Sequence, residues 1–191
     1  MANTVAKGNE IATIDVTLVS IEHTVGENTE EIILDTANKI GVTIATETQD
    51  KVALIVKGRL IAQKPETVTV TGNTIVLTDN VFNPEIVKIL QGGTIKTDGE
   101  GKFVGYEPPV VGSTDKGEVF TLHAYSAIYN AAGLITGYEK ISYPNCQGTP
   151  VAFNSEDGSF RAPEYTINSA PNSGEAPYKL AIVSELPVVT A

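Results

Sequence analysis

Residues 41–64 have the sequence GVTIATETQDKVALIVKGRLIAQK, and this stretch decides the fold class. Apolar and polar side chains alternate up to Gln49 and Asp50, which form a polar turn. Beyond the turn, apolar side chains fall on one face of an extended chain: Val52, Leu54, Val56, Leu60 and Ala62. The opposite face carries polar side chains: Lys51, Lys57, Arg59 and Gln63. The pattern predicts a long β-hairpin over 41–64 whose second strand is half-buried.

The second strand of this hairpin is unusually long. As one strand, residues 51–64 would reach roughly 45 Å, more than a domain of this size normally supports. Two explanations are open: Gly58 bends the strand, or the hairpin projects beyond its own core to meet another subunit. In the second case, polar side chains along the hairpin are candidate subunit-interface residues: Glu47, Gln49, Asp50, Lys51, Lys57, Arg59 and Lys64.

The rest of the chain is also rich in β-forming residues. Val, Ile and Thr recur, and 17 Gly and 10 Pro separate the runs. Hairpin turns are expected at Gly72 and Asn73 and at residues 130–133. Strands are expected at 11–21, 67–70, 74–78, 103–106, 118–129, 134–143 and 179–184. Short strands separated by frequent turns indicate a mainly β fold of sandwich or barrel-like type with long extended hairpins and loops.

One short helix is predicted over residues 83–91. Asn83 is a good N-cap, Pro84 suits the first helical position, and Glu85 suits the positive end of the helix dipole. Gly92 and Gly93 then end the helix. Barely two turns long, it must pack beside a sheet to be stable.

The 191 residues are expected to form a single domain. Residues 1–30 are interpreted as an N-terminal arm and first strand, and residues 145–177 as a long surface excursion that contacts neighbours. Residues 1–10 lack the pattern of a signal peptide. The longest aliphatic run, Val52–Val56, is far too short to span a bilayer. Folding in a cytoplasm without a membrane segment is therefore expected.

The charge balance bears on possible partners. The net charge is −10, which repels phosphate and makes specific binding of DNA or RNA improbable. Residues 1–50 hold nine acidic side chains against two basic ones, whereas residues 51–96 hold six basic against three acidic. Segments of opposite sign favour pairing within the subunit or between neighbours.

Few residues suggest catalysis or metal binding. Cys146 is the sole cysteine of the sequence and is interpreted as a small buried hydrophobic residue. His23 is expected in a loop and His123 on a strand face, and neither has a ligand or catalytic partner at a suitable spacing. Paired carboxylates at 30–31 and 156–157 are interpreted as solvated loop acids. We therefore expect no enzyme activity, cofactor or metal.

Aromatic residues leave one further possibility. The sequence has no Trp, so a stacking platform for sugars or single-stranded nucleic acid is poorly supplied. Four tyrosines nevertheless lie across one predicted hairpin: Tyr125, Tyr129, Tyr138 and Tyr143. Cross-strand packing or a subunit contact explains them with fewer assumptions.

An ordered series of short segments resembles the tail tube, or major tail, proteins of tailed bacteriophages. The segments are GVTIATET (41–48), VALIVKG (52–58), AQKP (62–65), TGNT (71–74), LTDN (77–80), NPEIVKILQGG (83–93), APEY (162–165) and APYK (176–179). They extend over roughly residues 30–185. They are patterns of strands, turns and a helix, and they contain no catalytic signature.

The resemblance implies a β-sandwich with a flanking helix, six copies closing into a ring, and rings stacking into a hollow tube. It implies a place in the virion tail, assembly in the host bacterial cytoplasm, and contact with tail-tip initiator, tape-measure and terminator proteins. DNA would pass through the lumen without specific binding. If the tube is built this way, Lys51, Lys57 and Arg59 should pair with acids of an adjacent subunit, because unpaired bases would attract DNA.

Two alternatives remain open at this stage. A tube subunit of a contractile tail or phage-derived particle would share the fold and add a sheath partner. A non-catalytic β-sandwich that binds carbohydrate or decorates a phage head would belong to another functional class, and it would remain monomeric when purified.

Overall fold

The computed structural model describes residues 11–26, 28–114 and 116–188. Within them the chain is mainly β with one short helix, as predicted. The helix is α1 (Pro84–Gln91). The strands are β1 (Thr13–Val25), β2 (Asn28–Leu34), β3 (Ala37–Gln49), β4 (Val52–Val56), β5 (Arg59–Lys64), β6 (Thr67–Asp79), β7 (Thr94–Thr97), β8 (Phe103–Glu107), β9 (Phe120–Tyr129), β10 (Ile135–Gly148), β11 (Glu164–Ser169) and β12 (Lys179–Val183).

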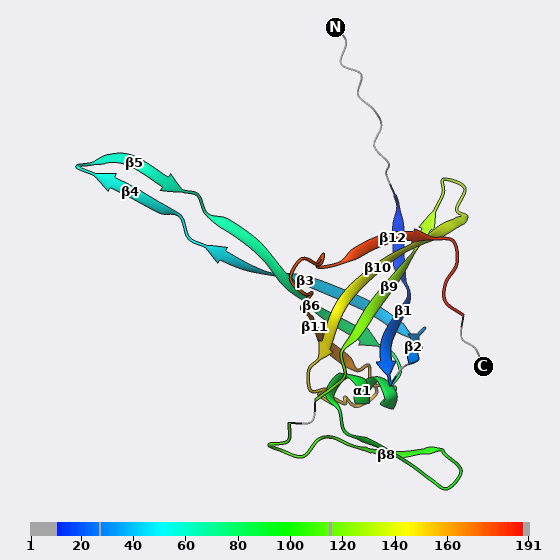
Figure 1. The fold of residues 1–191 in the computed structure, drawn as a ribbon. Helices are drawn as coiled ribbons and strands as arrows, with labels where there is room; N and C mark the ends of the chain where they lie inside the picture. The colour runs from blue at the N-terminus through cyan, green and yellow to red at the C-terminus, as the bar shows by residue number, and fades with distance from the viewer. Residues whose placement is uncertain (1–10, 27, 115, 189–191) are drawn as a thin grey trace.

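One antiparallel sheet of eight strands forms the body of the molecule. The strand order is β2-β1-β9-β10-β11-β6-β3, and β12 adds to β10. The sheet curls so that β1 contacts β3, although the two lie far apart in that order (Figure 1). Two separate ribbons, β4-β5 and β7-β8, extend from this body.

Strand β10 joins the two halves of the curled sheet. Residues 138–142 pair with β12, whereas residues 146–148 pair with β11. Between these segments the pairing of β10 with β9 shifts register after Tyr143, and Asn145 has a φ of 48°. Asn tolerates the left-handed region better than most residues, so the kink is accommodated there. This kink carries the strand from one half of the sheet to the other.

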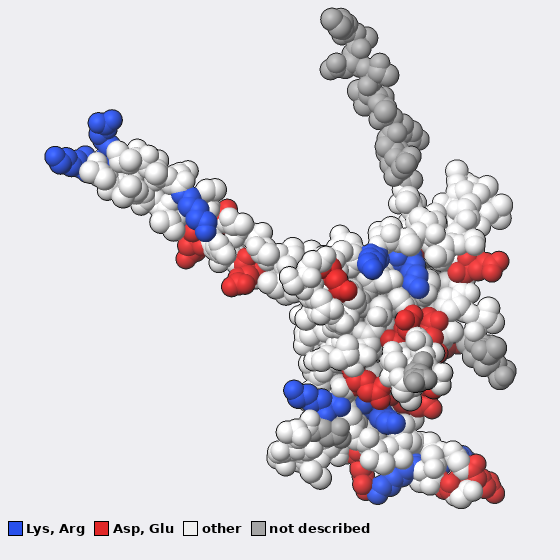
Figure 2. All heavy atoms as spheres, in the orientation of Figure 1, with Lys and Arg blue, Asp and Glu red and all other residues white. Residues whose placement is uncertain are grey.

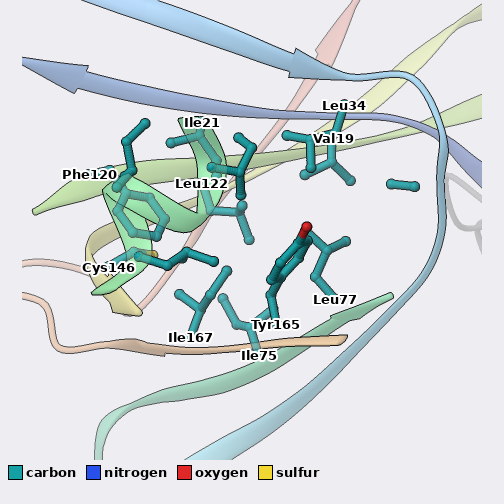
Figure 3. Close-up of a cluster of buried hydrophobic side chains, with 14 of the residues drawn as sticks. Val19, Ile21, Leu34, Ile75, Leu77, Phe120, Leu122, Cys146, Tyr165 and Ile167 are labelled. Carbon is teal, nitrogen blue, oxygen red and sulfur yellow. The ribbon is translucent and has the colours of Figure 1, made fainter. Parts of the chain in front are cut away.

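The core lies between the two halves of the sheet and is closed at one end by α1 (Figures 1 and 3). Strands from both halves supply its fully buried side chains, among them Val19, Ile21, Ile75, Leu77, Leu122, Tyr165 and Ile167. Full burial of one aliphatic side chain contributes about 1.5–3 kcal/mol, so this cluster is the main source of stability.

Helix α1 forms as predicted. The Asn83 side-chain oxygen accepts hydrogen bonds from the backbone N–H groups of Glu85 and Ile86, at 2.9 and 3.4 Å. Its buried face consists of Ile86, Val87, Ile89 and Leu90. At Gly148 of β10 an added Cβ would lie 2.5 Å from Leu90 Cβ. This glycine therefore allows the strand to approach the last turn of the helix.

The hairpin over 41–64 differs from the expectation in where the chain reverses. Residues 50 and 51 connect β3 to β4 without reversing the direction of the chain, and β3 pairs with β6 instead. The reversal occurs at Lys57 and Gly58, which have φ values of 49° and 75°. Two consecutive positive φ values are typical of a type I′ turn, whose twist matches that of the flanking strands. Thus 51–64 is a small hairpin of its own.

The expected hairpin turn at Gly72 and Asn73 is wrong, because both residues lie inside β6. Gly72 pairs with Ala45 whereas Val70 pairs with Thr46, so the register shifts beside the glycine and Thr71 is the extra residue of a β-bulge. The segment 145–177 includes β11, which pairs with β6 and β10 and buries Tyr165 and Ile167. That part of the segment therefore belongs to the sheet and is not a surface excursion.

Several other expectations are confirmed. Residues 130–133 connect β9 to β10, with the Asn130 side chain accepting hydrogen bonds from the N–H groups of Ala132 and Leu134. Strands also occur near the expected positions at β1, β8 and β12. Of the N-terminal arm, residues 1–10 lie outside the described residues. Among the helical residues that the structure describes, none belongs to a helix long and apolar enough to cross a membrane.

Candidate assembly surface

The candidate site is the projecting segment of residues 50–66, which we call the arm. It comprises β4, the turn at Lys57 and Gly58, and β5, and it extends the ribbon formed by β3 and β6 (Figure 1). Figure 1 shows the arm pointing away from the body of the molecule. The pairing of β3 with β6 sets where the arm begins, because Gln49 at the end of β3 lies opposite Thr67 at the start of β6.

Apolar side chains occur on both faces of the arm. On one face Leu54 lies opposite Ala62 and Val56 opposite Arg59, while on the other Ile55 lies opposite Leu60. The register shifts between Leu54 and Ile55, which changes the side on which the residues of β5 point. The expected division into one apolar and one basic face is therefore wrong, because the chain reverses at Gly58 and then bulges.

These apolar side chains are exposed in the single chain. Six large ones have between 47 and 63% of their surface exposed: Val52, Leu54, Ile55, Val56, Leu60 and Ile61. A two-stranded ribbon is marginally stable in water, and concentrated apolar surface of this kind is uncommon on a monomer. The strand that the sequence predicted to be half-buried is therefore exposed along its whole length. Its apolar surface can be removed from water only by contact with another molecule.

Basic side chains occupy the far end of the arm (Figure 2). Lys57 and Arg59 flank the turn, and among the described residues no ion pair involves them or Lys51. The Lys64 ammonium donates a hydrogen bond to Gln49 Oε1 at 3.0 Å. The remaining candidate residues, Glu47 and Asp50, are exposed near the base of the arm. The structure therefore places all seven candidates along one ribbon but joins only Gln49 and Lys64.

Three strands of the eight-stranded sheet present free edges. Within the described residues β2 pairs only with β1, β3 only with β6, and β12 only with β10. Leu180 and Ile182 on β12 and Ile44 on β3 are also exposed. Unpaired backbone groups on an exposed strand can hydrogen-bond to a strand of another chain. These edges are further places where a second molecule could pair.

A shallow apolar pocket of about 500 Å³ lies at the opposite end of β1 from α1. Ile14 and Tyr129 line it, and both are substantially exposed. Tyr125 and Tyr143 are buried in the sheet, and the Lys140 ammonium lies over the Tyr125 ring. The four tyrosines of this hairpin therefore do not form one exposed stacking platform, and cross-strand packing explains the buried two.

A second pocket, of about 290 Å³, lies beside α1 and was not predicted from the sequence. It is bordered by three carboxylates: Glu30 of β2, Glu85 of α1, and Glu118 just before β9. Val25, Ile32 and Ile95 supply apolar lining. We call it the acidic pocket. Its acids come from segments far apart in the sequence, and no local spacing indicated that they would meet.

His23 lies in the acidic pocket and belongs to β1, so the expected loop position is wrong. Its ring Nδ1 is 2.7 Å from a Glu118 carboxylate oxygen. Its Nε2 is 3.9 Å from a Glu30 carboxylate oxygen and has no hydrogen-bond partner, although the side chain is buried. A buried polar atom without a partner is uncommon, so this nitrogen marks a place where, among the described residues, a hydrogen-bond partner is missing.

Two side chains buried in the sheet, His123 and Cys146, have a shifted pKa. Burial lowers the pKa of His123, and the nearby Lys140 ammonium lowers it further. Burial also raises the pKa of the Cys146 thiol to about 11, which fits its interpretation as a small hydrophobic residue. In the part of the chain that the structure describes, no cluster of three or more His, Cys, Asp or Glu side chains is arranged to hold a metal ion.

Comparison with known proteins gives little further information. No protein-family model matches the chain, and no curated protein matches it. Among solved structures, a weak likeness is found to a chain in the cryo-EM structure of the anti-feeding prophage (AFP) baseplate, 6-fold symmetrised. The sequence identity is 11%, and the match covers 96% of this chain and 98% of that chain. The TM-score is 0.33, a likeness too low to assign a family.

Proposed function

We propose that this chain is a structural subunit of a phage tail tube, assembling as stacked hexameric rings into a hollow conduit through which DNA passes. The single observation that supports assembly most directly is the arm, whose apolar side chains are exposed on both faces. The tube, the ring of six and the place in the virion tail come from the resemblance of the sequence to tail tube proteins. On this proposal tail-tip initiator, tape-measure and terminator proteins are the other partners.

Assembly would bury the exposed apolar surface of the arm. Its large aliphatic side chains are about half exposed, so covering one completely gains roughly half of the about 1.5–3 kcal/mol of full burial. The free edges of β2, β3 and β12 can gain backbone hydrogen bonds if strands of neighbouring copies pair with them. Both gains depend on a second copy, and neither requires a ligand.

The charge supports passage of DNA without binding. The chain has a net charge of −10, so a tube built from it carries a negative field that repels phosphate. The unpaired bases Lys51, Lys57 and Arg59 oppose this effect if they face the lumen. In the assembled tube they should lie against acids of adjacent subunits.

The decisive experiment compares the full chain with a variant that lacks the arm. Because Gln49 lies opposite Thr67, residues 50–66 can be replaced by an Asn-Gly turn that closes β3 onto β6. Both proteins are concentrated and examined by negative-stain electron microscopy and sedimentation velocity. The full chain should form hollow rings or tubes, and the armless variant should remain a folded monomer.

Two outcomes would contradict the proposal. One is a full chain that stays monomeric at high concentration and binds carbohydrate, which would favour a binding module. The other is an armless variant that assembles as well as the full chain, which would show that the arm is dispensable for assembly.

A further inference from the structure

The acidic pocket has more carboxylates than basic side chains in its lining, and its geometry indicates which cation it can receive. His23 Nδ1 faces a carboxylate oxygen of Glu118, and a carboxylate can only accept, so Nδ1–H is the donor of that hydrogen bond. In the neutral ring the other nitrogen, Nε2, is then an acceptor. It is buried without a donor, 3.9 Å from a Glu30 carboxylate oxygen. Two acceptors thus lie side by side.

A guanidinium group suits this pair better than an ammonium group. Its N–H donors are held in a planar fork and can bind two neighbouring acceptors together, whereas an ammonium acts as a point charge. Glu85 and Glu118 add negative charge around the pocket, against the single positive charge of Lys88. The pocket therefore favours an arginine whose neighbouring residues are apolar, since part of its lining is apolar as well.

The tip of the arm has this composition. Arg59 directly follows the turn and lies opposite Val56, and the next residue, Leu60, is also exposed. No acid of the described residues pairs with Arg59. In Figure 1 the arm points away from the end of the molecule where α1 lies, so the tip and the acidic pocket of one chain are far apart. Only a second copy can bring them together.

We propose that the tip of the arm of one copy, residues 56–60, binds in the acidic pocket of a second copy. The Arg59 guanidinium donates a hydrogen bond to the exposed Glu30 carboxylate, and Val56 and Leu60 pack on the apolar lining beside Val25. His23 Nε2 is buried in the free chain, so the Glu30 side chain shifts as the guanidinium enters and opens this nitrogen to a second hydrogen bond. This proposal rests on the proposed function, because it specifies the contact through which copies join.

The symmetry of this contact has a consequence. The tip and the pocket are different surfaces of the same chain, so the contact is head-to-tail and each bound copy leaves its own tip free. Such contacts continue from copy to copy until they close into a ring or extend as a filament. A symmetric dimer, by contrast, would need both tips and both pockets to meet at once.

Charge reversal tests the proposed contact. Arg59→Glu and Glu30→Arg should each weaken self-association roughly tenfold or more, because each places like charges together. The double variant Arg59→Glu/Glu30→Arg should recover much of the association. Lys102→Glu makes the same charge change as Arg59→Glu at an exposed position outside the arm and the acidic pocket, and it should have little effect. Sedimentation velocity measures association, and thermal unfolding checks that each variant is folded.

Cysteine cross-linking gives a second measurement on chains that keep Arg59 and Glu30. The single variants Leu60→Cys and Val25→Cys are mixed under oxidising conditions and should form a mixed disulfide dimer, which should diminish when Arg59→Glu is added to the first. Leu60→Cys mixed with Glu156→Cys is the matched control, since Glu156 is exposed and lies outside the pocket, and it should cross-link little. The native Cys146 is buried and stays out of the reaction.

The outcomes separate this inference from the proposed function. If the wild-type chain assembles while charge reversal and cross-linking show no dependence on Arg59 or Glu30, the tip-to-pocket contact is wrong and the assembly subunit stands. If the wild-type chain does not associate at all, the proposed function fails and this contact fails with it. Loss in each single variant, recovery in the double variant, and a specific mixed disulfide together support the contact.

Discussion

Leu54 and Leu77 lie on the same long ribbon, yet Leu77 is fully buried whereas Leu54 is 55% exposed. Leu77 belongs to the part of β6 that pairs with β3 and β11 inside the sheet, and it contacts the core. Leu54 belongs to the arm, where the ribbon has two strands and no covering layer. A leucine therefore stabilises the fold at one end of the ribbon, and a leucine at the other end is exposed for contact with another copy.

The first prediction compares the same truncation at the two positions. Leu77→Ala should lower the free energy of unfolding by about 2–5 kcal/mol, because it leaves a cavity in the core. Leu54→Ala should change it by less than about 0.5 kcal/mol, because the side chain is solvated in the monomer. Urea unfolding of the dilute monomer measures both. Equal losses at the two positions would mean that the arm packs against its own chain in solution.

The second prediction concerns association. Leu54→Glu should weaken self-association strongly and leave the thermal unfolding midpoint of the monomer almost unchanged, because a charge would have to be buried in the contact. Ser159→Glu, in an exposed turn, adds the same charge away from the arm and serves as control. Sedimentation velocity gives the degree of association. If Leu54→Glu associates as strongly as the wild-type chain, the arm is not part of the contact.

The third prediction concerns the close approach of β10 to α1. An added Cβ at Gly148 would lie 2.6 Å from Leu90 Cα, so the backbone of strand or helix must move. Gly148→Ala should therefore lower the free energy of unfolding by roughly 1–3 kcal/mol. Gly99→Ala is the matched control, because nothing lies within 4 Å of the added Cβ there. A stability loss as small as that of the control would show that the helix adjusts freely.

The fourth prediction concerns pH. The folded-state pKa of His123 lies below 6.5, mainly because of burial and then because of Lys140, so the unfolded chain binds a proton more readily. The stability contributed by neutral His123 is thus present above about pH 6.5 and is lost as the pH falls below it. Around the ring lie Ser142, Glu22, Lys140 and Glu31.

The measurement uses the variant His123→Gln. Urea unfolding is followed at about pH 7.5 and about pH 5.5, where histidine changes charge. The wild-type chain should lose more stability than the variant between the two conditions. The two proteins share every other ionisable group, so the difference between them isolates His123. An identical pH dependence of the two proteins would contradict the lowered pKa.

Local patterns were sufficient for elements whose ends are marked by their own residues. The two ends of α1 are marked in this way. Asn83 caps the first turn, Pro84 has the φ that a helix needs, and Gly92 adopts the positive φ that ends it, and each of these is a property of a single residue. The turn at 130–133 is likewise encoded by Asn130 and Gly133. Partners distant in sequence were harder to assign. Gly72 signals either a turn or a bulge, and pairing of β6 with β3 places it beside a bulge.

The sequence by itself determined the mainly β composition, the short helix and the acidic charge, because these depend on residue type and near-neighbour spacing. Only the tertiary structure decided that a hairpin projects from the body, where it reverses, which of its side chains face solvent, and that Glu30, Glu118 and His23 meet in one pocket. The physical reason is that register and burial are set by strand pairs distant in the chain, and a one-residue bulge moves every following side chain to the other face.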